Sequence, residues 1–260
     1  MRPRDVIKQG LLIAILAAAL PCVFAQAPAP AAQKPAKASA PEDLTGNWVS
    51  IVTEDYRWRM VTPLKGDSAS VPLNLEGRKV VNAWDPAKDE ANNLQCKSYG
   101  APAIMRVPGR LRISWADDNT LKIEADAGTQ TRLFHFGGQP PANATPSWQG
   151  YSTARWEPGA GRGARGGLGV TFEGFESRSL EVSTTQLRAG YLRKNGVPYS
   201  DKATVQEYYD SFKEPNGEEW FTVTTIVTDP VYLAIPFVTT TDFRREPDAS
   251  KFSPSVCTAR

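Results

Sequence analysis

The sequence predicts an all-β protein whose strands close into an antiparallel up-and-down barrel of about 8–9 strands. Many short segments alternate hydrophobic and polar residues, and turn sequences such as Asp117-Asp118-Asn119 and Pro215-Asn216-Gly217 separate them. Only one stretch, after the first strand, has helical spacing. A closed barrel also removes the exposed strand edges that an open sheet would leave. An open β-sandwich is the alternative architecture.

The first strand is predicted to run from Asp43 to Met60 and to open the folded domain. Alternation along it places seven residues on one face: Trp48, Ser50, Val52, Glu54, Tyr56, Trp58 and Met60. This face mixes aromatic rings with a carboxylate. It therefore predicts a barrel that encloses a semi-polar cavity rather than one filled with Val and Leu.

A short helix is predicted from Asn74 to Trp84, with a second helical turn at Ala87–Asn92. Every later element is expected to be a strand. The predicted strands are Arg110–Ala116, Thr120–Asp126, Thr129–Phe136, Tyr151–Glu157, Ser179–Leu187, Val205–Phe212, Glu219–Thr228 and Ile235–Arg245.

Residues 1–25 have the layout of a secretory signal peptide: a basic start, the apolar run Leu11–Leu20 and a small residue, Ala25, at the cleavage position. Residues 26–42 are rich in Ala and Pro and are expected to form an extended tether. Residues 43–260 are predicted to form a single β-barrel domain. The mature protein is expected in the periplasm or outside the cell, without stable membrane insertion after cleavage.

Charge argues against nucleic acid as a partner. The chain has 30 Lys and Arg and 28 Asp and Glu, and the predicted signal peptide contains three basic residues and one acidic residue. The mature chain therefore keeps 27 of each sign. Such a balance offers no basic surface for a polyanion. The sequence does not define an oligomeric state.

Two cysteines, Cys96 and Cys257, remain after signal cleavage. In an exported protein a single pair favours a structural disulfide, which would join the C-terminal segment to the region after the helices. A reactive thiol or a metal ligand is the alternative. Two isolated cysteines and one histidine make a poor metal set, so no metal and no cofactor are predicted.

The start of the predicted barrel resembles the lipocalin or calycin pattern, in which a G-x-W sequence opens the first strand and a basic residue ends the last. Here the pattern is Gly46-Asn47-Trp48, with Arg244 or Arg245 as the basic partner. The resemblance implies that Trp48 closes the barrel base and that the basic side chain packs across its ring.

A broader resemblance covers most of the mature chain and is to an uncharacterised exported bacterial β-rich family. It is based on an ordered set of motifs: Cys96-Lys-Ser-Tyr-Gly100, Met105-Arg-Val-Pro108, Pro146-Ser-Trp-Gln-Gly-Tyr-Ser152, Gly196-Val-Pro-Tyr-Ser-Asp201 and Asp229-Pro-Val-Tyr-Leu-Ala-Ile-Pro236. The family often has His where this chain has Tyr199. The resemblance implies an exported β-rich domain and no particular substrate.

Four residues are candidates for proton transfer. His135 is the only histidine, and its side chain is the one that titrates near neutral pH. Glu54 would act as a base, with Tyr56 or Tyr199 as the acid. The alternative is that His135 is hydrogen-bonded on a strand face and that Glu54 is solvated.

A small-molecule ligand would be held by aromatic and cationic side chains. The candidates are Trp58, Arg57, Arg106, Trp148 and Tyr151. Arg57, Arg59, Arg106 and Arg193 are the side chains able to hold a ligand carboxylate. Ordinary core packing for the rings and a surface position for the arginines are the alternatives.

These observations lead to three hypotheses of function. The first is an exported binding protein for a small, largely apolar or aromatic ligand in a barrel cavity. The second is a cofactor-independent lyase, dehydratase or isomerase using the His, Glu and Tyr set. The third is a structural protein of the cell envelope. The run Gly161-Arg-Gly-Ala-Arg-Gly166 matches a dinucleotide fingerprint only by spelling, because no helix is predicted after it.

Overall fold

The computed structural model describes residues 34–157 and 179–260, which belong to one compact unit, Lys34–Arg260. The predicted signal peptide, the first part of the tether and the Gly-Arg run lie outside the described residues. The end of the predicted tether is not extended. It contains the one-turn helix α1 (Ala36–Ser39), which bonds to the turn before Thr120 through Lys37 N and Asp118 O at 3.0 Å.

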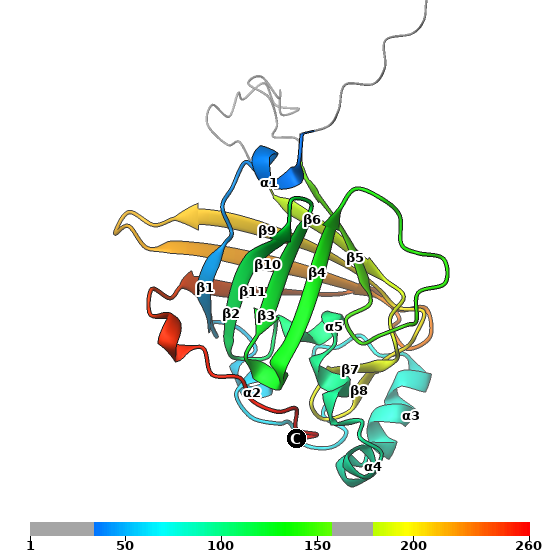
Figure 1. Ribbon diagram of the computed structural model, residues 1–260. Coiled ribbons are helices and arrows are strands. Elements are labelled where there is room, and N and C mark those ends of the chain that lie inside the picture. Colours follow the sequence, from blue (N-terminus) through cyan, green and yellow to red (C-terminus); the bar gives the residue numbers. More distant parts are fainter. Residues whose placement is uncertain (1–33, 158–178) are drawn as a thin grey trace, which may run out of the picture. The chain divides into compact units, whose positions relative to one another are not determined.

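Nine strands close into a barrel, which confirms the predicted fold class (Figure 1). Around the barrel the order is β1-β11-β10-β9-β6-β5-β4-β3-β2. The strands are β1 (Gly46–Ile51), β2 (Arg110–Asp117), β3 (Thr120–Ala125), β4 (Gln130–Phe136), β5 (Tyr151–Trp156), β6 (Leu180–Thr185), β9 (Thr204–Lys213), β10 (Glu219–Thr228) and β11 (Phe237–Arg245). A separate two-stranded sheet, β7 (Gly190–Arg193) and β8 (Val197–Tyr199), was not predicted.

The prediction of a purely antiparallel barrel is wrong at one seam. β4 and β5 are parallel, with Phe134 opposite Ser152 and Phe136 opposite Ala154. The cause is the connection, residues 137–150, which returns to the end of the barrel where β4 began instead of turning back at once. Every other neighbouring pair in the barrel is antiparallel.

The predicted first strand is too long. β1 ends at Ile51, and Tyr56–Arg59 forms the short helix α2. Asp55 precedes α2 with a φ of 52°, a left-handed conformation that breaks the alternation on which the prediction depended. Glu54, Tyr56 and Trp58 therefore do not line the inside of the barrel.

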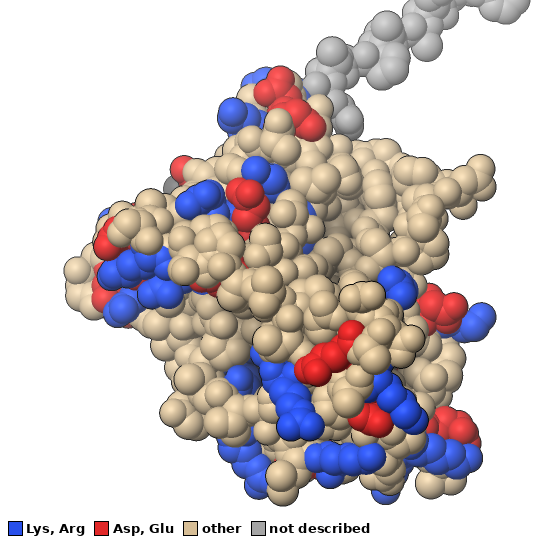
Figure 2. Space-filling view, turned by 60° about the horizontal axis from the view of Figure 1, so that its bottom comes forward, with Lys and Arg blue, Asp and Glu red and all other residues tan. Residues whose placement is uncertain are grey.

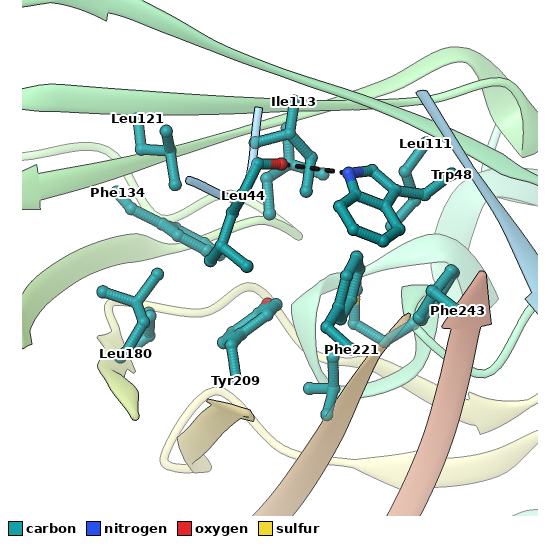
Figure 3. Packing of buried hydrophobic residues seen from close by; sticks show 14 of the residues in the cluster. Leu44, Trp48, Leu111, Ile113, Leu121, Phe134, Leu180, Tyr209, Phe221 and Phe243 are labelled. Carbon is teal, nitrogen blue, oxygen red and sulfur yellow. Dashed lines mark hydrogen bonds between the residues drawn. The ribbon is translucent and has the colours of Figure 1, made fainter. Parts of the chain in front are cut away.

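The inside of the barrel is packed with side chains. Trp48 stands edge-on to Phe221 with a centroid distance of 4.7 Å, and its Nε1 donates to Leu44 O at 2.9 Å (Figure 3). Phe221 in turn stacks on Phe243 at 4.9 Å. The buried residues around them include Leu111, Ile113, Leu121, Ile123, Phe134, Leu180, Val182, Tyr209 and Val223.

Trp48 is also covered by a cation, as the G-x-W pattern implies, and the partner is Arg245. Its guanidinium lies 4.3 Å from the Trp48 ring centroid, and its Nη1 donates to Thr45 O at 2.8 Å. A Cβ atom at Gly46 would overlap this guanidinium. Glycine at the first position of the pattern is therefore what lets the arginine close over the tryptophan.

One ion pair crosses the inside of the barrel. Arg132 donates to both carboxylate oxygens of Glu207, at 2.8 and 2.5 Å, and both side chains are buried. Tyr209 and Thr184 also bond to Arg132. The Glu207 carboxylate raises the pKa of Arg132 despite its burial. These bonds use both terminal nitrogens of Arg132 and leave its buried Nε without a partner among the described residues. The pair links β4 to β9 across the interior.

The end of the barrel at which β1 stops is covered by the segment between β1 and β2 and by β7 and β8 (Figure 1). The covering elements are α2, α3 (Leu75–Ala83), α4 (Pro86–Ala91), η1 (Gln95–Tyr99) and α5 (Ala101–Ile104). Ile104 and Met105 belong to the same core cluster as Trp48, so the α5 region packs into the barrel end.

A disulfide fixes the C-terminal segment to this covered end. Cys96 in η1 is bonded to Cys257, 161 residues away, which confirms the predicted pair. Beside it, Ser255 N donates to Asp126 O at 2.8 Å, and Thr129 Oγ1 donates to Ser255 O at 2.8 Å. The last residues of the chain therefore form part of the cap.

Trp48→Ala is expected to lower the free energy of unfolding by about 3–5 kcal/mol, because it leaves a cavity beside Phe221 and removes the ring that Arg245 covers. Urea unfolding measures this change. Leu133→Ala, on the outer face of β4, is the control and should change stability by less than about 1 kcal/mol. An equally small loss for Trp48→Ala would contradict its role as the plug of the barrel.

Reduction of the Cys96–Cys257 disulfide is expected to lower the melting temperature. In the chain-entropy model a closed loop of this length stabilises the fold by about 3–5 kcal/mol. Calorimetry with and without a phosphine reductant measures the difference, and a Cys96→Ala/Cys257→Ala protein should not respond to the reductant. Two titratable thiols together with an unchanged melting temperature would refute the prediction.

Candidate functional site

A cleft of about 420 Å³ opens in the cap at the covered end of the barrel. Its walls come from α2 and the residues after it, from η1, α5 and the residues after α5, from β7 and from the C-terminal segment. The lining residues are Trp58, Arg59, Met60, Val61, Thr62, Ser98, Tyr99, Ala103, Arg106, Val107, Pro108, Ala127, Leu192, Arg193, Lys194, Ser255 and Arg260. Lys and Arg side chains gather on this side of the molecule, with acidic side chains among them (Figure 2).

Arg106 is one of the arginines that line this cleft and is 5% exposed. Its Nη2 donates to Asp55 Oδ2 at 2.6 Å. Its Nε and Nη1 are buried and have no hydrogen-bond partner among the described residues. A buried guanidinium usually satisfies its donors, and Arg106 is the one arginine of the described chain with two buried nitrogens left unpaired.

Arg59 reaches the same place from α2 and is 8% exposed. Its Nε donates to the backbone oxygen of Arg106 at 3.0 Å, and its Nη1 forms an ion pair with Glu54. Its Nη2 is buried and has no partner in the described part of the chain. The bond to the Arg106 backbone places the two guanidinium-bearing segments side by side.

Arg193 enters from β7 and is 5% exposed. Nη1 donates to Ala69 O and Nη2 to Ser70 Oγ, both at 2.8 Å, while its guanidinium lies 4.8 Å from the ring centroid of Trp58. Nε is buried without a partner among residues 34–157 and 179–260. Within those residues, no carboxylate lies at ion-pair distance from Arg193.

The arginines repel one another. Burial lowers the pKa of Arg193 to about 10, and the charge of Arg106 is the next largest cause. Burial also lowers the pKa of Arg59; Glu54 opposes this change, while Arg106 adds to it. Both guanidinium groups remain charged at neutral pH. An anion bound among them would relieve this repulsion and provide the missing acceptors.

Strained backbone holds two of these contacts. Asp55, the partner of Arg106, has a φ of 52°, and Ser70, the partner of Arg193, has a φ of 63°. Non-glycine residues in the left-handed region are uncommon and cost on the order of 1 kcal/mol or more. Such strain is typical of sites where side chains are held in position for binding.

A second cationic group lies at the C-terminal side of the cleft. Lys194 Nζ is 5.0 Å from the ring centroid of Tyr99 and donates to Thr258 Oγ1 at 3.2 Å. Burial would raise the pKa of Tyr99, but hydrogen bonds from Lys194 and Thr258 outweigh burial and lower it. The disulfide between η1 and the C-terminal segment therefore keeps two walls of the cleft together.

The structure does not bring His135 and Glu54 together. His135 in β4 pairs with Thr120 of β3, which in turn pairs with Asp117 at the last residue of β2. The His135 ring stacks on Tyr151 at 4.6 Å on the outside of the barrel. Glu54 follows β1 at the other end of β2 and pairs with Arg59. β2 has eight residues, so these two ends are roughly 20 Å apart.

The two candidate acids are also separated from His135. Tyr56 is 66% exposed on α2. Tyr199 is buried. Its hydroxyl lies so close to Gly100 and Gly190 that a Cβ atom at either glycine would overlap it. No described residue forms a hydrogen bond with this hydroxyl. Burial raises the pKa of Tyr199. A proton-transfer set of these four residues does not exist in the described structure.

The predicted ligand-binding residues fall into two groups. Trp58 and Arg106 line the cleft, and Arg57 lies beside it, 5.1 Å from the Trp58 centroid and paired with Asp67. Trp148 and Tyr151 do not line it: Trp148 bonds to Ala189 O at 3.1 Å, and Tyr151 stacks on His135.

Sequence reasoning missed Tyr99, Leu192 and Lys194 as cleft residues. Tyr99 lies in one of the recognised motifs, Cys96-Lys-Ser-Tyr-Gly100, but nothing in that motif signals its position in a binding site. Leu192 lies in β7, and Lys194 directly follows that strand. β7 was not predicted.

No protein-family model matches this sequence, and no curated protein or solved structure is significantly similar to it. Within the described ranges, no helix is long and apolar enough to cross a membrane. The same residues contain no group of three or more His, Cys, Asp or Glu side chains placed to hold a metal ion. Function is therefore inferred from the geometry of the cleft.

Proposed function

We propose that this chain is an exported binding protein for a small organic anion, and that the anionic group lies among Arg59, Arg106 and Arg193 in the cap cleft. The observation that supports this most strongly is that these three guanidinium groups together have four buried nitrogens without partners among the described residues. The cleft volume is within the range of small-molecule sites. The disulfide supports export, because such bonds persist in oxidising compartments.

The proposed ligand position is the cap cleft, whereas the first hypothesis from the sequence placed the ligand inside the barrel. The inside contains the packed cluster around Trp48, Phe221 and Phe243, whereas the cleft lies at the end of the barrel. Trp58 and Leu192 supply apolar wall beside the cations, so the ligand combines an anionic group with an apolar or aromatic part. The separation of His135 from Glu54 favours binding over proton transfer.

Benzoate is a suitable probe, because it has one carboxylate on an aromatic ring. Isothermal titration calorimetry of the wild-type protein is expected to show one site. Arg106→Gln should weaken benzoate binding by about 10- to 100-fold, since hydrogen bonds to charged groups contribute about 1.5–3 kcal/mol. Arg155→Gln is the matched control, because Arg155 is an exposed arginine on β5 and its loss changes the net charge equally.

Equal benzoate affinity in the wild-type, Arg106→Gln and Arg155→Gln proteins would contradict the proposed site. Absence of benzoate and sulfate binding by the wild-type protein would do the same. Circular dichroism spectra of the variants show whether each one remains folded, and Arg106→Lys separates the effect of charge from that of guanidinium geometry.

The pH dependence of sulfate binding distinguishes the arginine cleft from a histidine site. The cleft guanidinium groups are protonated below the lowered pKa of Arg193, about 10. Affinity is therefore expected to fall above about pH 10, as Arg193 loses its charge. Tyr99, whose pKa is lowered, adds a negative charge to the same cleft when it ionises, so it weakens anion binding in the same direction as the pH rises. A histidine site would instead lose sulfate affinity with a midpoint at about pH 6.5, the ordinary pKa of histidine. If this loss disappeared in His135→Ala, sulfate would bind near His135 and not in the cleft.

A further inference from the structure

Apolar side chains lie exposed at the mouth of the cleft. Met60 and Val61 line the cleft, yet they are 46% and 65% exposed. Tyr56 and Leu64, in the same segment of the chain, are 66% and 83% exposed. Exposed apolar residues that stand singly need no explanation, but Met60 and Val61 are adjacent and line the cleft, which favours apolar contact with a ligand there.

The apolar wall extends inward from these residues. Ala103, Val107, Pro108 and Leu192 line the same cleft. An anionic group bound at Arg106 would thus share the cleft with these apolar side chains and with the exposed side chains of Met60 and Val61. A ligand with a charged head and a flexible apolar chain matches this combination of arginines and apolar side chains better than a uniformly polar anion does.

We infer that the ligand is a monomeric single-chain amphiphile, with its carboxylate or similar anionic head at Arg59, Arg106 and Arg193 and its alkyl chain leaving over Met60 and Val61. This inference rests on the proposed function, because it requires the head to bind among the arginines. It adds the chemical class of the tail and the direction in which the tail leaves.

A free amphiphile fits this surface better than an anionic bilayer does. Glu54, Asp55 and Asp67 pair with Arg59, Arg106 and Arg57, so these cations are not unopposed. The acidic side chains among the basic ones on this side of the molecule are visible in Figure 2. A membrane-binding face would be expected to display unopposed Lys and Arg.

The test is calorimetric titration with straight-chain carboxylates from butanoate to decanoate, each below its critical micelle concentration. Affinity is expected to increase by about fourfold for each methylene that packs in the cleft, which corresponds to about 0.8 kcal/mol per buried methylene. Met60→Gln/Val61→Ser should reduce this increase to less than about twofold per methylene. Val238→Ser, an exposed valine on β11 outside the cleft, is the matched control and should keep the wild-type increase.

The outcomes separate the two proposals. Affinity that does not change with chain length but falls in Arg106→Gln would overturn the amphiphile inference and leave the proposed anion site intact. Binding at every length that is insensitive to Arg106→Gln would overturn both. Binding to phosphatidylglycerol vesicles without binding to monomeric decanoate would place the ligand at a membrane surface and would also overturn the inference.

Discussion

Three buried guanidinium groups, those of Arg59, Arg106 and Arg193, have more donors than the described chain provides acceptors for. Burying charge is unfavourable unless partners compensate for it, so the fold must hold these side chains in place by other means. Asp55 and Ser70 do so from strained backbone positions, and Trp58 packs against Arg193. The disulfide fixes the neighbouring wall. The proposed anion would supply acceptors for the nitrogens that remain unpaired.

The barrel provides the rigid support for this cap. Trp48, covered by Arg245 and packed on Phe221, closes one part of the interior, and the Arg132–Glu207 pair joins β4 to β9. Because side chains fill this interior, the proposed ligand site is placed in the cleft at the barrel end. Ile104 and Met105 connect the two parts, since they belong to the barrel core while Ala103 and Arg106 beside them line the cleft.

Sequence reasoning predicted the eight barrel strands after β1 well, because each is a local alternation bounded by turn residues. It missed the short strands β7 and β8. It failed at Asp43–Met60, where the alternation continued by chance through Asp55, a residue whose side chain type tolerates a left-handed backbone. The parallel pairing of β4 with β5 depends on the path of residues 137–150, which has no local signature. The arginines were recognised as groups able to hold a carboxylate, but their meeting point depends on tertiary contacts between segments more than 40 residues apart.

The most direct test of the central claim is a crystal structure of the protein soaked in bromobenzoate, with data collected at the bromine absorption edge. The account predicts one anomalous peak in the cap cleft and a carboxylate within about 3.2 Å of the free nitrogens of Arg106. It also predicts that the peak is absent from crystals of Arg106→Gln. A bromine peak confined to the inside of the barrel, or beside His135 on its outer face, would contradict the account.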